Sequence, residues 1–387
     1  MYQKRKYKHF ILLCLVLDLL TMVFLGYRYL DRKIPDEIHI DKNSGLDLSQ
    51  ISNLPFVSFG DTITASGEGS YQLPCRLFGK IAFKNIKVKP TEADTILVSG
   101  STVGIYMETD GVLVIDTGEI LSENGQMQDP AKNILKPGDY IVALNEQKIS
   151  CKQDLINDLE TIDGKPVTVS VRRNNSTIPV SLSPAQDASG KYKLGIWVRD
   201  DTQGIGTLTY VDQDGRYGAL GHGISDVDTG LLMQIRDGKL YRASVGAVKK
   251  GEKGNPGELS GTIYYRDDQI LGTITSNSET GIKGMLYAMP QELSGHSFVQ
   301  TAYRQEVHTG NASIYCSIDG SVKEYTVEIE KINLSHRDIN KSMVIRVKDQ
   351  NLLEKTGGIV QGMSGSPILQ DGKLIGAVTH VFVADPS

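Results

Sequence analysis

Residues 362–380 read GMSGSPILQDGKLIGAVTH, a glycine-rich turn followed by two short apolar runs. Glycine at positions 362 and 365 permits a sharp turn that presents the hydroxyl of Ser364. In such a turn the backbone N–H groups of Gly362 and Ser364 can converge on one point and hold a developing oxyanion. Taken alone, the run is also typical of an ordinary Gly-Ser turn. It therefore predicts a candidate nucleophile, Ser364, next to a less favoured hydroxyl at Ser366.

Closely spaced strands are expected on both sides of this turn. A polar turn at 187–191 marks a boundary, and the apolar runs after it are separated by glycines, with no helical pattern between them. These features predict a mainly β domain at 192–387, built as an antiparallel barrel or sandwich. The expected strands are 194–198, 206–211, 240–245, 261–265, 325–332, 343–347 and 375–379.

A catalytic serine needs a base, and His222 is the strongest candidate among the seven histidines. It ends the run YGALGH at 217–222, just after a short apolar strand in a glycine-rich corner. The pattern resembles chymotrypsin-like proteases, whose histidine follows a strand and precedes the serine, and it implies a chymotrypsin-like double β-barrel. The remaining histidines border the predicted anchor, lie in the stalk or polar loops, or are too close in sequence to Ser364: His9, His39, His296, His308, His336 and His380.

Residues 95–185 form a second legible unit. The run LKPGDYI at 135–141 resembles the stretch that precedes the helix of PDZ domains. This resemblance implies a peptide ligand that adds as a strand beside a carboxylate-binding loop. That loop would be 101–106, with Gly104 and Ile105 at its centre. The alternative is a PDZ domain that only positions its neighbour.

The N-terminal segment predicts a single membrane anchor. Residues 9–27, HFILLCLVLDLLTMVFLGY, would reach about 28 Å as a helix, close to the roughly 30 Å of a bilayer core. The basic residues around this run modestly favour a cytoplasmic location for residues 1–8, with the bulk of the chain outside. No small-x-small site follows, so an uncleaved signal anchor is favoured over a cleaved signal peptide. Asp18 at mid-span is protonated, faces a partner helix, or is a tolerated defect. Residues 28–94 are expected to hold a stalk, to about residue 55, and then a small β-rich region.

The overall composition excludes several classes of protein. The 387 residues, 40% of them apolar and 22% charged, suffice for two or three domains. A formal net charge of −5 with scattered lysines and arginines argues against a nucleic-acid partner. The four cysteines are far apart and have no histidine at metal-ligand spacing, so neither a zinc site, another metal or cofactor, nor a disulfide framework is expected. One bridge through Cys75 or Cys316 stays open.

Four sequence blocks together resemble one family. The blocks are GIGTLTY at 204–210, YGALGHGISD at 217–226, NPGELSG at 255–261 and TGGIVQGMSGSPI at 356–368. With the anchor and the PDZ unit, they are similar to the stage IV sporulation protein B peptidases of endospore-forming bacteria. The resemblance implies a serine endopeptidase anchored in the inner forespore membrane, with its protease domain in the space between forespore and mother cell. It further implies that the enzyme trims itself and cleaves a membrane-bound inhibitory subunit of an intramembrane protease complex, which activates the late mother-cell sigma factor.

The family's catalytic residues carry over by position. Its serine and histidine correspond to Ser364 and His222, and its acid to Asp349. Fifteen residues before the serine is an unusual place for a triad acid, and Asp226 and Asp228, just after His222, are rivals.

The C-terminus departs from the family pattern. The family's chain normally continues beyond its HVFV strand into a further aromatic strand, so a part of the barrel is expected to be missing here.

A catalytically idle, membrane-tethered PDZ adaptor is the alternative function. Such an adaptor has no need to hold both Ser364 and His222. A PDZ-bearing heat-shock protease fits worse, because in those enzymes the PDZ domain follows the protease domain.

Overall fold

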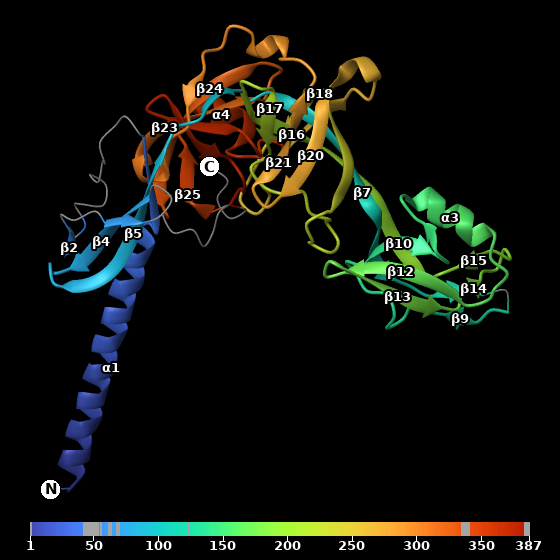
Figure 1. The fold of residues 1–387 in the computed structure, drawn as a ribbon, viewed down its shortest axis with the longest axis horizontal. Helices are drawn as coiled ribbons and strands as arrows, with labels where there is room; N and C mark the ends of the chain where they lie inside the picture. The colour runs from blue at the N-terminus through green and yellow to red at the C-terminus, as the bar shows by residue number, and fades with distance from the viewer. Residues whose placement is uncertain are drawn as a thin grey trace.

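The structure is a computed structural model that describes residues 2–41, 54, 56–60, 64–66, 70–122, 124–333 and 341–382. Figure 1 shows a long N-terminal helix, a small sheet beside its end, two larger β units in the centre, and a smaller domain at the far side. The described chain is mainly β, as predicted. Stalk residues 43–45, His336 and residues 383–387 lie outside the described residues.

Helix α1 (Tyr2–Lys33) contains the predicted anchor. Its segment Lys8–Lys33 is long and apolar enough to cross a membrane, and its most apolar window is not buried in the protein. A helix satisfies all its own backbone groups, which a chain in hydrocarbon requires. The chain is therefore a single-pass membrane protein.

A small sheet fixes the C-terminal end of α1. Ile34 and Ile38 are fully buried in its core, and Lys84 donates a hydrogen bond of 2.8 Å to the carbonyl of Ile34. Lys84 also pairs with Asp36 at 2.6 Å. Much of the predicted stalk is therefore folded structure. The strands follow the order β1 (Glu37–Asp41), β5 (Ile81–Thr91), β4 (Ser70–Leu77) and β2 (Val57–Phe59), and β3 (Thr64–Ser66) pairs with β4.

Six strands close a barrel in the centre of the molecule. Around the ring they are β7 (Thr102–Thr117), β18 (Ile235–Lys249), β20 (Ile270–Ser278), β21 (Gly281–Leu286), β17 (Arg216–Ala219) and β16 (Ile196–Asp212), which pairs back with β7. Alternate residues of β7, namely Val103, Ile105 and Met107, are buried in its core, as expected for strands with one inward face. The outer additions are β6 (Thr95–Val98), β19 (Glu258–Ile263), β22 (Val299–Gln300) and the 3-10 turns η1 (Asp267–Gln269), η2 (Gln291–Leu293) and η3 (Arg304–Glu306).

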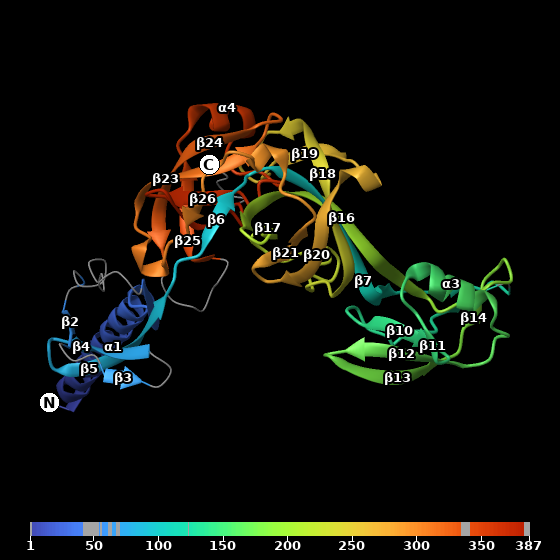
Figure 2. The same cartoon turned by 45° about the horizontal axis from the view of Figure 1, so that its top comes forward.

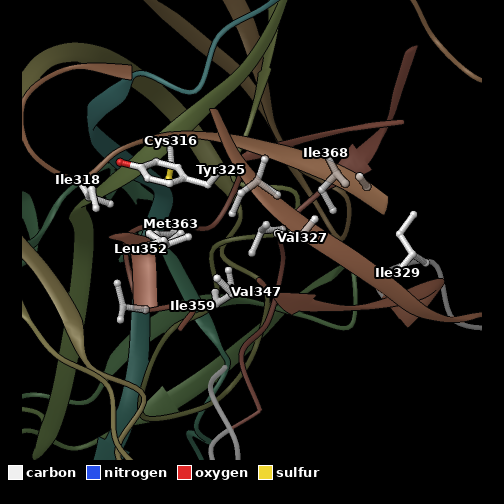
Figure 3. Packing of buried hydrophobic residues seen from close by; sticks show 14 of the residues in the cluster. Cys316, Ile318, Tyr325, Val327, Ile329, Val347, Leu352, Ile359, Met363 and Ile368 are labelled. Carbon is white, nitrogen blue, oxygen red and sulfur yellow. The ribbon is translucent and has the colours of Figure 1, made fainter. Parts of the chain in front are cut away.

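The second β unit is a five-stranded sheet. Its order is β25 (Met343–Val347), β24 (Val322–Ile332), β23 (Gly310–Ser317), β26 (Pro367–Gln370) and β27 (Lys373–Ala377). Helix α4 (Gln350–Thr356) covers its core. Leu352 of α4 and Met363 point among the side chains of the strands, as Figure 3 shows. The glycine-rich turn that carries Ser364 is thus anchored in a core by the residue directly before Ser364.

The PDZ domain is an insertion between two strands of the barrel. Figure 2 shows β7 and β16 running together from the barrel into this domain, where Thr117 pairs with Ile196. Its own core lies between its sheet and α3 (Lys152–Glu160). The sheet continues from β7 through β10 (Tyr140–Leu144), β12 (Val167–Arg173) and β13 (Ser176–Leu182), and the short strands are β8 (Ile120–Leu121), β9 (Met127–Gln128), β11 (Gln147–Lys148), β14 (Ala185–Gln186) and β15 (Tyr192–Lys193).

The insertion shifts the expected domain boundaries of 95–185 and 192–387. Residues 95–109 pack with the six-stranded barrel and its neighbouring strands, whereas the PDZ core begins at Val112 and extends to Val198. At the junction the buried Thr109 hydroxyl bonds the carbonyls of Gly111 at 2.6 Å and Asp200 at 3.0 Å. A shared pair of strands therefore joins the two units.

Candidate functional site

One cavity of about 470 Å³ brings Ser364 and His222 together. It lies between the barrel and the second sheet, since its walls come from both. The barrel contributes β16 and the chain after β17, and the second unit contributes the turn that carries Ser364 and the chain after β27. Ser364 and His222 are both half-buried there. They are therefore shielded in part from solvent but accessible to a substrate.

The turn that carries Ser364 is held by two buried threonines of β16. The Thr207 hydroxyl donates to the carbonyl of Gly362 at 3.0 Å, and the Thr209 hydroxyl donates to the carbonyl of Gly365 at 2.7 Å. Gly362 and Gly365 have φ angles of 96° and 95°, which other residues rarely adopt. A Cβ atom at position 365 would lie 2.3 Å from the backbone oxygen of Thr207. Both the backbone angle and the available space therefore require glycine at these positions.

In this turn, backbone N–H groups that donate a hydrogen bond alternate with N–H groups that have no acceptor among the described residues. Met363 N–H donates to Val360 at 3.1 Å, and Gly365 N–H donates to Val378 at 2.8 Å. Within the described part of the chain, the N–H groups of Gly362 and Ser364 have no acceptor. Both residues line the cavity. These are the two donors that the sequence predicted for an oxyanion hole.

The two serine hydroxyls of the turn differ in their surroundings. Ser364 Oγ lies 3.3 Å from the carbonyl oxygen of Thr379, a long hydrogen bond. Ser366 is fully buried, and its Oγ has no partner among the described residues. Ser364 is therefore the hydroxyl that a substrate can reach.

His222 follows a strained corner. Leu220 has a φ of 70°, which is unusual for a residue other than glycine. The Nδ1 atom of His222 lies 2.9 Å from the carbonyl oxygen of Gly223. When Nδ1 carries the proton it donates to this carbonyl, and Nε2 is left with a lone pair. Among the described residues no hydrogen bond joins His222 to Ser364; in structures without substrate, such bonds are often long or misaligned.

His380 lines the same cavity, although the sequence alone did not favour it as a catalytic residue. Its ring centroid lies 5.5 Å from that of His222, and both rings line the cavity. Partial desolvation, with smaller contributions from His222 and Lys341, lowers the pKa of His380 below its ordinary value. Closeness in sequence to Ser364 counted against it, although the β26–β27 hairpin returns the chain beside the turn. The Gly365–Val378 hydrogen bond marks that return.

The structure does not bring Asp349 into the cavity. Asp349 is the N-cap of α4, and its Oδ1 accepts from the N–H of Leu352 at 3.0 Å. In the described chain no hydrogen bond connects Asp349 with His222.

Asp226 and Asp228, the alternatives to Asp349, form ion pairs and hydrogen bonds in and around the loop after His222. Asp226 is buried, forms an ion pair with Arg199, and accepts from the N–H and hydroxyl of Thr229 at 2.8 and 2.9 Å. Burial tends to raise the pKa of Asp226, but the bonds from Thr229 and the charge of Arg199 outweigh it, and the pKa lies below its ordinary value. Asp228 binds the other nitrogen of Arg199 at 3.0 Å.

The structure corrects the prediction of a carboxylate-binding loop at residues 101–106. Gly104 and Ile105 lie inside β7, which pairs on one edge with β16 and on the other with β18. With both edges occupied, no peptide can add as a strand at these residues. A Cβ atom at Gly104 would lie 2.3 Å from a side-chain carbon of Ile263. Ile105 instead lines the cavity that contains Ser364.

The four cysteines are separate from one another in the structure. Cys14, Cys75, Cys151 and Cys316 are all free thiols, so the bridge left open for Cys75 or Cys316 does not form in this structure. Within the described ranges no group of three or more His, Cys, Asp or Glu side chains is placed to hold a metal ion.

Comparisons with known proteins found a family, two relatives and two solved structures that are similar to parts of the chain. Residues 190–387 match the family described as SpoIVB peptidase S55. Two Xylella fastidiosa proteins, each described as "Putative zinc metalloprotease", are similar over shorter stretches. One, from strain 9a5c, is 28% identical over 123 residues, 31% of this chain and 25% of that protein. The other, from strain Temecula1, is 30% identical over 92 residues, 23% of this chain and 20% of that protein.

Two solved PDZ domains also match. That of the SdrC-like protein of Listeria innocua is 26% identical, with a TM-score of 0.20, and covers 23% of this chain and 94% of its own. That of Listeria monocytogenes is 20% identical, with a TM-score of 0.19, and covers 23% and 87%. The matched stretches span a quarter or less of the curated Xylella relatives.

Proposed function

This chain belongs to the SpoIVB peptidase S55 family, and we propose that it is a serine endopeptidase with Ser364 as nucleophile and His222 as general base. One observation carries the proposal. A single cavity holds both side chains together with two backbone N–H groups, at Gly362 and Ser364, that have no acceptor among the described residues. Nucleophile, base and oxyanion donors are the groups that acyl transfer requires.

The proposed reaction begins when Ser364 Oγ turns from the Thr379 carbonyl toward His222. The oxygen attacks the scissile carbonyl while Nε2 of His222 takes its proton, and the N–H groups of Gly362 and Ser364 bind the oxyanion. His222 then protonates the leaving amine. Water, activated by the same nitrogen, hydrolyses the acyl-enzyme and restores Ser364.

We retain Asp349 as the proposed triad acid on the strength of the family resemblance. To act, its carboxylate must exchange the cap of α4 for Nδ1 of His222. The geometry also supports a simpler arrangement, in which the Gly223 carbonyl orients His222 and no carboxylate takes part. The two arrangements make different predictions for the variant Asp349→Asn.

The proposed substrates follow from family membership and the anchor. They are the chain itself and a membrane-bound regulatory subunit of an intramembrane protease complex. Cleavage of that subunit would signal activation of the late mother-cell sigma factor during sporulation. The proposed location is the inner forespore membrane, with the protease domain in the intermembrane space. A PDZ peptide ligand stays part of the proposal, although it would bind elsewhere than at Gly104 and Ile105.

The test compares two serine variants in a time course of self-trimming on gels. Ser364→Ala removes the attacking oxygen from a half-buried turn and is expected to abolish trimming while leaving the fold intact. Ser366→Ala is the matched control and is expected to trim normally. Equal trimming by both variants would show that Ser364 is not the nucleophile. Absence of trimming in the unmodified chain and of cleavage of any protein substrate would favour the alternative, an idle PDZ adaptor.

A further inference from the structure

A basic groove lies where the membrane helix meets the second sheet. Its cavity of about 730 Å³ is bounded on one side by α1 from Phe24 to Lys33. The other side is formed by the end of β24 and the start of β25. The groove is separate from the cavity of Ser364 and His222, with which it shares no lining residue.

The charged side chains that line this groove are all cationic among the described residues. Five cationic side chains line it, and no carboxylate does so among the described residues: Arg28, Arg32, Lys33, Lys331 and Lys341. The chain as a whole has a formal net charge of −5, so this concentration of positive charge is local. Such a cluster attracts an anionic group, and phosphate is a group that arginine and lysine both bind well.

The groove also has an apolar side that continues into the membrane span. Phe24 and Leu25 line it, and each is 60% exposed. They precede Arg28 by four and three residues, about one helical turn. The cations therefore follow directly on the apolar run 9–27. A bilayer that covers this run places Arg28 and Arg32 at the level of the phospholipid headgroups.

Packing fixes the two sides of the groove relative to each other. Ile34, at the end of α1, is fully buried in the core of the small sheet. Ile332 of β24 packs against the same core and also lines the groove. The helix end and the sheet edge are therefore held by one hydrophobic cluster.

From these features we infer that the groove binds an anionic phospholipid. Its phosphate would lie among the five cations, and its acyl chain would run down α1 over Phe24 and Leu25. A soluble phosphate would bind the cations alone and make no contact with the apolar side. A lipid satisfies both sides, and it holds the catalytic unit against the membrane surface in one orientation.

The experiment uses the full-length chain in detergent. Native mass spectrometry measures the lipids retained from an equimolar mixture of phosphatidylglycerol and phosphatidylcholine with identical acyl chains. The unmodified chain is expected to retain phosphatidylglycerol preferentially. The double variant Lys331→Gln, Lys341→Gln is expected to lower that preference by about twenty-five-fold, since each lysine near an anionic headgroup contributes roughly five-fold.

The matched control is Lys148→Gln, Lys253→Gln, which changes two exposed lysines that lie outside the groove. It is expected to retain the preference within two-fold, and thermal unfolding of both variants checks that they fold. Equal retention of the two lipids by the unmodified chain would overturn the inference. So would an equal loss in the control, which would indicate diffuse attraction. Displacement of phosphatidylglycerol by millimolar inorganic phosphate alone would identify a soluble-anion site and refute the lipid assignment.

Discussion

Replacing Asp349 by Asn and by Ala separates a catalytic carboxylate from one that only caps a helix. Asp349 accepts from the N–H of Leu352 at 3.0 Å, and Leu352 is fully buried in the core of the second sheet. Asn and Asp cap helices about equally well, whereas Ala costs about 1 kcal/mol. Asp349→Asn should therefore change the free energy of unfolding by less than about 0.5 kcal/mol, and Asp349→Ala should lower it by about 1 kcal/mol, roughly 2–4 °C in Tm.

The effect on catalysis follows a different scale. In a serine triad, exchange of the acid for its amide lowers kcat by about 10⁴-fold, because the imidazole is held in the wrong tautomer. That factor corresponds to about 5 kcal/mol of transition-state stabilisation. If Asp349 is the acid, Asp349→Asn should lower the self-trimming rate by about this factor with the fold intact.

The assay pairs urea unfolding with rates of self-trimming for the same preparations. Asp228→Asn is the control for a carboxylate near His222, since this side chain is half exposed and binds Arg199. Its trimming rate is expected to stay near that of the unmodified chain. Undiminished trimming by Asp349→Asn would remove Asp349 from the triad and leave the Gly223 carbonyl as the group that orients His222. Equal destabilisation by Asn and Ala would instead refute the capping argument.

Three further predictions concern stability. Ser366→Ala should raise the free energy of unfolding by about 1 kcal/mol in urea titrations, because its buried hydroxyl has no partner among the described residues; a destabilised variant would contradict this. Gly365→Ala should cost more than about 3 kcal/mol, since it adds a backbone clash to a φ of 95°, whereas Gly372→Ala, at a φ of 77° in open space, should cost about 1 kcal/mol; similar losses for the two would refute the clash. Asp371 lies 2.8 Å from His308 and raises the pKa of that imidazole above its ordinary 6.5, so the pair stabilises the fold below pH 6.5 and loses this contribution as pH rises through the raised pKa. Because both groups are substantially exposed, the contribution should be under about 1 kcal/mol, and Asp371→Asn should flatten this part of the stability–pH curve.

The sequence predicted local geometry better than pairing between distant strands. The turn at Ser364 was predictable because glycine adopts positive φ at little cost, and Gly362 and Gly365 both do so. The corner before His222 was predictable from its glycines.

The PDZ boundary and the loop at Gly104 were not predictable in this way. An alternating run indicates a strand but does not say which strands occupy its two edges. The partner of Gly104 on one edge, Tyr241, lies more than a hundred residues away. His380 was missed for a related reason, since a hairpin folds it back beside Ser364.

The insertion of the PDZ domain makes the barrel depend on chain from both sides of it. A fragment that begins at residue 190 would lack β7, one of the six barrel strands. Strands β16 and β18 would then have open edges. Such edges favour aggregation. Deletion of the PDZ domain is a different operation, because β7 and β16 already lie hydrogen-bonded in antiparallel register at Glu108 and Asp201. A tight two-residue turn could join them there. The PDZ domain can therefore be deleted by itself, whereas the barrel still needs β7, the strand that leads into that domain.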